Sequence, residues 1–213
     1  MQKAMTITAL ALLALPVAAS AHPHIFADAR LEVVAGADNS IEELRNVWRF
    51  DDMFSSSVLM DFDANANLKL EQDELDEISK TIYDSLVDYD YFTFITHDGK
   101  KIDIVRPDKL HVDFQDNQLL VFFSVKPKEK LPATGKLSFG VYDPTMYTAI
   151  DFSTDDHITL DGAGLKSCKH AVVRPDADEI IAQNQAMLTE AFFNDPAAND
   201  MGKLFATRLE LTC

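Results

Sequence analysis

The stretch Ile25-Phe26-Ala27-Asp28-Ala29-Arg30-Leu31-Glu32-Val33-Val34 decides the fold class of this chain. Apolar side chains stand at every second position, which is the period of a strand with one buried face. Asp38-Asn39 is a typical turn sequence, and residues 41–50 can return as the second strand of a hairpin. We therefore expect an antiparallel sheet that begins in this region.

Short strands continue beyond this hairpin, with helical segments between them. A hairpin is expected over residues 92–105, around His97-Asp98-Gly99, and a second one over 110–125. Further strands are expected near residues 137–142, 147–152, 158–160, 171–173 and 209–212, and a helix from Asp176 to about Phe193. This pattern predicts an α+β fold, a mainly antiparallel β-sandwich-like domain with a helical insertion at residues 51–89 and a C-terminal helix.

The insertion contains an acidic loop, residues 63–74, between two segments with helical apolar spacing. Its oxygen-bearing side chains match an EF-hand calcium loop, and Lys69 would offer its backbone carbonyl. The candidate calcium ligands are Asp63, Asn65, Asn67, Lys69, Glu71 and Glu74. Leu68 stands where the motif uses Gly at positive φ, a strain of about 1 kcal/mol that should weaken binding. The alternative is a degenerate loop whose acids are only solvated.

Residues 1–21 have the features of a cleaved signal peptide, with an apolar run too short for a membrane anchor. Cleavage after Ala21 would leave one domain, residues 22–213, beginning His22-Pro23-His24. The α-amine and the two imidazoles can then bind a metal ion. Pro23 has no backbone N–H, so the fold must supply further ligands. The alternative is an N-terminus that frays and binds nothing.

Three further residues are candidate metal ligands. Asp51 follows Trp48-Arg49-Phe50, Asp143 lies in the turn of residues 141–147, and His111 faces the polar side of a strand. Each has an ordinary alternative, as a helix cap, a turn residue or a solvent-facing histidine. A mixed nitrogen and oxygen ligand set suits Zn²⁺, with Ni²⁺ or Co²⁺ as alternatives.

Charge and cysteine content limit the functional class. The formal net charge is −16, which disfavours nucleic acid and anionic membranes and suits cations or a basic partner. Cys168 and Cys213 are the two cysteines, and in an exported chain they are expected to form a disulfide worth roughly 4 kcal/mol. No catalytic triad order, P-loop or Rossmann motif occurs, so we do not expect an enzyme.

The His22-Pro23-His24 start, Trp48-Arg49-Phe50-Asp51-Asp52, the acidic loop, the turn at residues 141–145 and the C-terminal cysteine together resemble a family of periplasmic proteins classed as a domain of unknown function. Its members are described as periplasmic components of uncharacterised transport systems, encoded beside nickel/cobalt or zinc transporters. The resemblance implies a periplasmic location and an inner-membrane metal transporter as partner.

The sequence therefore predicts a non-enzymatic periplasmic protein that binds a transition metal and buffers it or delivers it to a transporter. One alternative is a copper enzyme with an N-terminal histidine site and a partner such as His111. Another is a calcium-stabilised adaptor of a transporter, in which the histidines are incidental.

Overall fold

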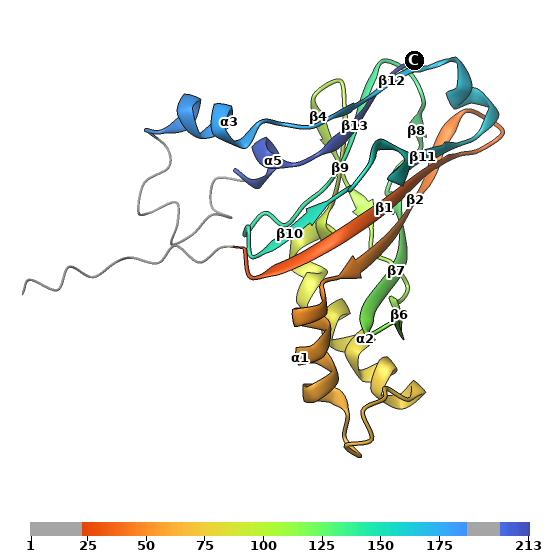
Figure 1. Ribbon diagram of the computed structural model, residues 1–213. Helices are drawn as coiled ribbons and strands as arrows, with labels where there is room; N and C mark the ends of the chain where they lie inside the picture. The colour runs from red at the N-terminus through yellow and green to blue at the C-terminus, as the bar shows by residue number, and fades with distance from the viewer. Residues whose placement is uncertain (1–22, 187–200) are drawn as a thin grey trace, which may run out of the picture.

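The first hairpin has the predicted burial pattern. In the computed structural model, which describes residues 23–186 and 201–213, strand β1 (Ile25–Ala35) pairs antiparallel with β2 (Ser40–Phe50) (Figure 1). The inward side chains of β1 are buried, among them Ala29, Leu31 and Val33. The predicted signal peptide and His22 lie outside the described residues.

Strand β1 pairs with other strands along both of its edges. Beyond β2 the sheet continues to β7 (Gln118–Pro127), which also pairs with β6 (His111–Gln115) and β5 (Ile104–Val105), while β8 (Leu131–Pro132) pairs with β2. On the other edge β1 pairs in parallel with β10 (Thr148–Asp151) and then with β11 (Ile158–Asp161). These parallel pairs depart from the antiparallel expectation, because alternation within a strand does not specify its distant partner.

A second, five-stranded sheet is antiparallel throughout. Its order is β12 (Lys169–Val173), β13 (Arg208–Thr212), β9 (Lys136–Val141), β3 (Thr93–His97) and β4 (Lys100–Ile102). Trp48 and Val121 of the first sheet share one hydrophobic core with Ile95, Phe139 and Leu209 of the second. The two sheets thus form a sandwich-like body.

Helices α1 (Asp52–Phe62) and α2 (Gln72–Leu86) project from one end of this body, at the bottom of Figure 1. We call residues 52–86 the helical extension. A 3₁₀ segment, η1 (Val87–Phe92), follows α2, which ends at Leu86 and not at the predicted Tyr89. Within η1, Asp90 and Tyr91 adopt positive φ. The helical extension packs on the core through half-buried Phe54, Leu75 and Ile82.

The remaining helices within residues 23–186 and 201–213 are short. They are α3 (Ala177–Asn184), capped by Asp176 as predicted, α5 (Gly202–Phe205) and the 3₁₀ segments η2 (Asp155–His157) and η3 (Ala163–Ser167). The predicted continuation of α3 to Phe193 lies partly outside the described residues. Among the residues that the structure describes, no helix has the length and apolar character needed to cross a membrane.

Candidate functional site

The start of β1 is held by the loop before β10. The backbone N–H of His24 donates a hydrogen bond to the carbonyl of Tyr147 at 2.8 Å, and Ile25 then pairs with Thr148. The His24 and Tyr147 rings lie 4.8 Å apart between centroids. The fold therefore fixes the backbone of His24, the third residue after the predicted cleavage point.

Asp51 connects the start of β1 to the start of α1. One carboxylate oxygen accepts the backbone N–H groups of Met53 and Phe54 at 2.9 and 3.0 Å, which caps α1. The other accepts the N–H of Phe26 at 2.9 Å. Burial alone would raise the pKa of Asp51, but these backbone hydrogen bonds outweigh it and lower the pKa below its usual value.

Asp143 organises the turn on the other side of the β1 start. This carboxylate is 4% exposed and accepts the N–H and hydroxyl of Thr145 at 2.7 and 2.6 Å. Its second oxygen accepts the N–H of Thr148 at 2.9 Å. Asp143 thereby holds the turn that presents the Tyr147 carbonyl to His24. Asp51 is thus a helix cap and Asp143 a turn residue, the roles given above as alternatives to metal binding.

His111 lies far from this junction. The strand register runs in one row from Arg30 through Val47 and Phe122 to His111. His111 is thus three strands from β1 and level with a residue six positions after His24, about 20 Å along the strand. Within residues 23–186 and 201–213, no three His, Cys, Asp or Glu side chains are grouped as a metal site.

In the loop between α1 and α2, carboxylates accept hydrogen bonds from the backbone of the same loop. Asp63 accepts the backbone N–H groups of Asn67 and Leu68 at 3.1 and 2.6 Å. Glu74, 6% exposed, reaches back to the N–H groups of Ala64 and Glu71 at 2.8 and 2.9 Å. Leu68 has φ 62°, so the residue standing in the glycine position does adopt the left-handed conformation.

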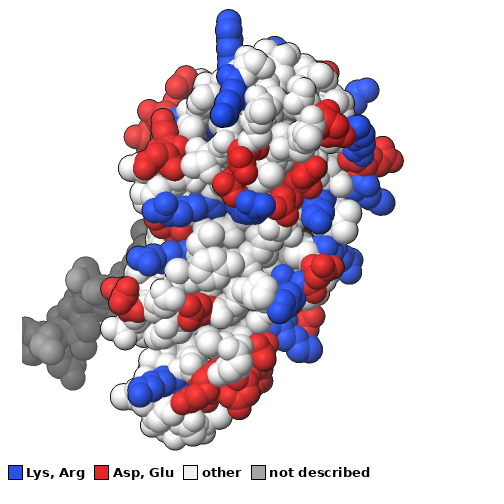
Figure 2. Space-filling view, turned by 90° about the vertical axis from the view of Figure 1, so that its right-hand side faces the viewer, with Lys and Arg blue, Asp and Glu red and all other residues white. Residues whose placement is uncertain are grey.

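The side-chain amides of the same loop converge on Glu71. Asn67 and Asn65 donate to its two carboxylate oxygens at 2.7 and 3.2 Å. The hydrogen bond from Asn67 is the main reason why the pKa of Glu71 is lowered. The extension has nine Asp and Glu against two Lys, and acidic side chains gather at this lower end of the molecule in Figure 2. The backbone N–H of Lys69 donates to the Asn67 side chain at 2.8 Å.

A polar cluster on β1 has no counterpart in the sequence analysis. His157 has its Nε2 3.1 Å from the Arg30 guanidinium and its Nδ1 3.3 Å from the Asp28 carboxylate. Asp28 accepts the N–H and hydroxyl of Ser153. Partial burial would raise the pKa of Asp28, but the Ser153 hydrogen bonds lower it overall. In the sequence, the polar positions that alternate with apolar ones in β1 were the sole indication of this cluster.

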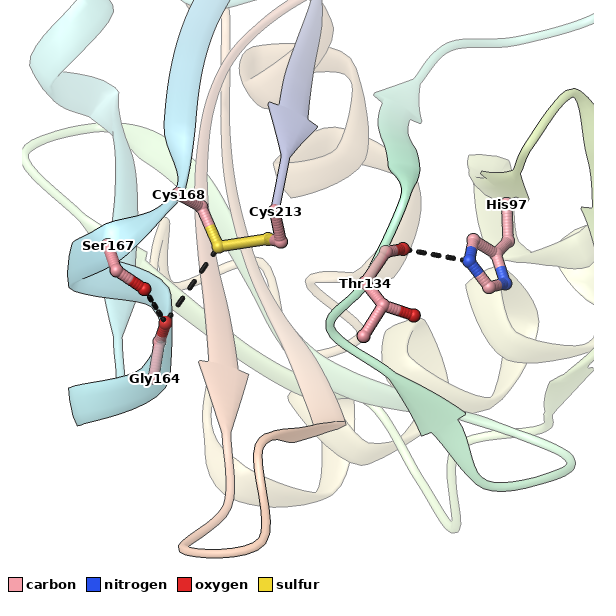
Figure 3. Close-up of a disulfide and its surroundings, with 6 residues drawn as sticks. All are labelled: His97, Thr134, Gly164, Ser167, Cys168 and Cys213. Carbon is pink, nitrogen blue, oxygen red and sulfur yellow. Dashed lines mark hydrogen bonds between the residues drawn. A yellow bond between two sulfur atoms is a disulfide. The ribbon is translucent and has the colours of Figure 1, made fainter.

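The predicted disulfide is present. Cys168 and Cys213 are bonded directly beyond the paired ends of β12 and β13 (Figure 3). The N–H of Cys213 donates to the carbonyl of Gly135 at 3.0 Å. Nearby, His97 donates from Nε2 to the carbonyl of Thr134 at 2.8 Å. A disulfide of this kind is typical of proteins from an oxidising compartment.

Fold and site define a disulfide-closed, mixed α+β protein with an acidic helical extension. The chain belongs to the family described as protein of unknown function (DUF1007), whose model matches residues 7–213. An uncharacterised 15.5 kDa protein from the trpE 3′ region of Spirochaeta aurantia is 30% identical over 103 residues, which cover 48% of this chain and 74% of that protein. The predicted resemblance to a family of unknown function is thus confirmed; its periplasmic and transporter associations stay predictions.

Proposed function

We propose that this protein is a non-enzymatic, periplasmic metal-binding protein that buffers a transition metal or passes it to an inner-membrane transporter. His22 and His24 are the primary ligands, and Zn²⁺ is preferred over Ni²⁺ and Co²⁺. The observation that carries the proposal is the hydrogen bond from His24 to the Tyr147 carbonyl, because a ligand on fixed backbone loses less freedom on binding. The signal peptide is part of this proposal, since processing must expose the His22 amine.

A carboxylate from the same junction completes the proposed ligand set. Asp143 and Asp51 flank the start of β1, and in each the second carboxylate oxygen accepts a single N–H, which leaves it a lone pair for a cation. Asp143 is preferred because it holds the turn that contacts His24. His111 is left out, and its distance also removes the partner histidine of the copper-enzyme alternative.

The test uses protein processed in the periplasm. Intact mass gives the mature N-terminus, and native mass spectrometry with competition against a zinc chelator gives bound metal and affinity. Replacing both His22 and His24 with Ala should weaken Zn²⁺ binding at least about tenfold, as expected when primary ligands are lost. His170→Ala, an exposed histidine on β12, is the matched control and should leave the affinity unchanged. Equal zinc affinity in the double variant would refute the proposal.

We further propose that the loop of the helical extension binds Ca²⁺ as an EF-hand-like structural site. The supporting observation is that Leu68 already has the positive φ which the sixth position of the motif requires. The proposed ligands are Asp63, Asn65, Asn67, the Lys69 carbonyl, Glu71 and Glu74. Extracellular calcium sites work at roughly 10⁻⁴–10⁻³ M, so a weakened loop can still fill.

Thermal unfolding with and without millimolar calcium tests this second proposal. Calcium should raise the Tm of the wild-type protein, and Glu74→Gln should remove most of that increase. Glu77→Gln, an exposed acid on α2 outside the loop, is the charge-matched control. If both variants respond alike, calcium acts on the general acidity of the extension and not through the loop. That result would favour the adaptor alternative, in which the acidic face docks a basic partner.

A further inference from the structure

A cavity of about 730 Å³ lies between the second sheet and the helices α3 and α5 (Figure 1). Residues of β3, β4, β9 and β13 line it from the sheet, and Ile180 and Leu204 line it from the helices. The side chains that these strands send into the hydrophobic core, such as Phe139, lie on the opposite face of the sheet. The cavity is therefore a surface hollow outside the core, of a size typical of small-molecule sites.

A glycine in the middle of the sheet makes room for this cavity. The strand register places Gly140 of β9 between Phe94 of β3 and Arg208 of β13. A Cβ added to Gly140 would lie 3.6 Å from the Tyr142 ring and 3.9 Å from the Arg208 Cβ, which is ordinary van der Waals contact. The space could thus hold a side chain, and without one it is a hollow between an aromatic ring and an arginine.

One wall of the hollow is aromatic. Phe94 and Tyr142 both line the cavity, and their rings stack at 4.2 Å between centroids with an interplanar angle of 22°. The Lys101 ammonium lies 5.8 Å from the centre of the Phe94 ring. Stacked rings offer a flat apolar surface, which suits a ligand with a flat apolar group.

The other wall carries a guanidinium. The Arg208 side chain is 33% exposed, and its Nε donates to Glu210 at 2.9 Å. Within the described residues, the two terminal nitrogens of Arg208 have no hydrogen-bond acceptor. The acids that line the cavity belong to the α3 side, where Asp176 caps the helix and Glu179 accepts from Gln183. A guanidinium with available N–H groups pairs well with a carboxylate.

We propose that this cavity binds a small molecule with a flat apolar part and one carboxylate. The flat part stacks beside Phe94 and Tyr142 over Gly140, and the carboxylate accepts the terminal N–H groups of Arg208. The aromatic wall contributes affinity for the apolar part, and the guanidinium selects the acid over a neutral molecule of the same shape. The proposal does not rest on metal binding at the N-terminus.

Two probes of the same shape test the charge preference. 3-Phenylpropionate carries the carboxylate, and 3-phenylpropanamide is its neutral counterpart. Of the seven glycines, Gly99 and Gly140 line the cavity, so their amide peaks in a ¹H–¹⁵N spectrum report binding there. We expect 3-phenylpropionate to shift both peaks saturably, to leave Gly36 unchanged, and to bind about tenfold more tightly than the amide. EDTA in every titration excludes binding through a metal ion.

Three variants locate the binding. Arg208→Gln should lower the affinity for 3-phenylpropionate about tenfold, to that of the amide, and leave the affinity for the amide unchanged. Arg49→Gln removes the same charge at an exposed position of β2 in the first sheet, and should change neither affinity. Gly140→Val fills the hollow and should weaken the binding of both probes.

The two probes are compared on the unsubstituted protein, so that result stands even if a variant fails to fold. Absent or unsaturable glycine shifts, or equal affinity for the acid and the amide, would overturn the proposal. Equal losses in Arg208→Gln and Arg49→Gln would also overturn it, because the effect would then come from the general charge of the protein. Unchanged binding to folded Gly140→Val would place the probes elsewhere and would overturn it as well.

Discussion

The two ends of the described chain are fastened to the sandwich in different ways. Cys213 is joined covalently to Cys168, whereas His24 and Phe26 are held by hydrogen bonds to the Tyr147 carbonyl and the Asp51 carboxylate. The covalent closure is independent of pH in the folded state. The N-terminal closure rests on hydrogen bonds, one of them to Asp51, whose pKa is lowered by hydrogen bonding in the folded protein, so it is the end that pH can alter.

Removing the covalent closure should have the largest effect on stability. Replacing Cys168 and Cys213 with Ala frees a loop with a sequence separation of 45 residues. The free energy of unfolding should fall by about 4 kcal/mol, because the unfolded chain regains the entropy that the cross-link removed. Urea unfolding of the variant, and of the wild type with a reductant, measures this loss. A fall below about 1 kcal/mol would mean that hydrogen bonds hold this end sufficiently.

At the N-terminal end, Asp143→Ala should have the larger effect. It leaves the donors of Thr145 and Thr148 without their acceptor at a buried position, at a cost of about 2–3 kcal/mol. Urea unfolding gives the size, and amide hydrogen exchange at Ile25 should quicken because the neighbouring strand loosens. Asp161→Ala, an exposed acid at the end of β11, is the control and should change neither.

Asp51→Ala should cost less and should depend on pH. Loss of the α1 cap is worth about 1–2 kcal/mol near neutral pH. The pKa of Asp51 is lower in the folded protein, so its stabilisation is fully present above the unfolded pKa of about 4 and is lost as the pH falls through the folded value. The stability difference between wild type and variant should therefore shrink below about pH 4. A difference that does not change with pH would exclude the carboxylate's charge as its source.

The smallest effect is expected in the loop of the helical extension, where stability depends on the backbone conformation of one residue. Leu68→Gly removes a side chain from a position at φ 62° and should stabilise the loop by about 0.5–1 kcal/mol. The calcium midpoint from thermal unfolding should fall accordingly. Ala64→Gly is the control, because Ala64 is not among the residues with positive φ and gains nothing from glycine. A lower midpoint in both variants would assign the effect to general loop flexibility.

The strand and helix positions could be predicted because their causes are local. Alternation from Ile25 to Val33 reports burial at every second residue, and Asp176 precedes a helix as a cap should. The left-handed conformation of Leu68 followed from its place in a known loop pattern. In each case the information lies within a few residues of the feature.

The pairings between distant segments could not be predicted. Nothing in β1 specifies that β10 and β11 lie along its second edge in parallel, since that edge is chosen by the packing of the whole sandwich. Arg30 and His157 meet across 127 residues of sequence, and neither lies in a recognisable motif. The roles of Asp51 and Asp143 were open for the same reason, because a carboxylate before a helix or in a turn can serve as a cap or as a ligand.

The position of β1 between β2 and the pair β10 and β11 has a consequence for folding order. Strand β1 cannot complete its hydrogen bonds until residues 148–161 have also been synthesised. Until then one edge of β1 stays unpaired, so a nascent chain that lacks this segment cannot complete the first sheet. Such long-range pairing slows folding.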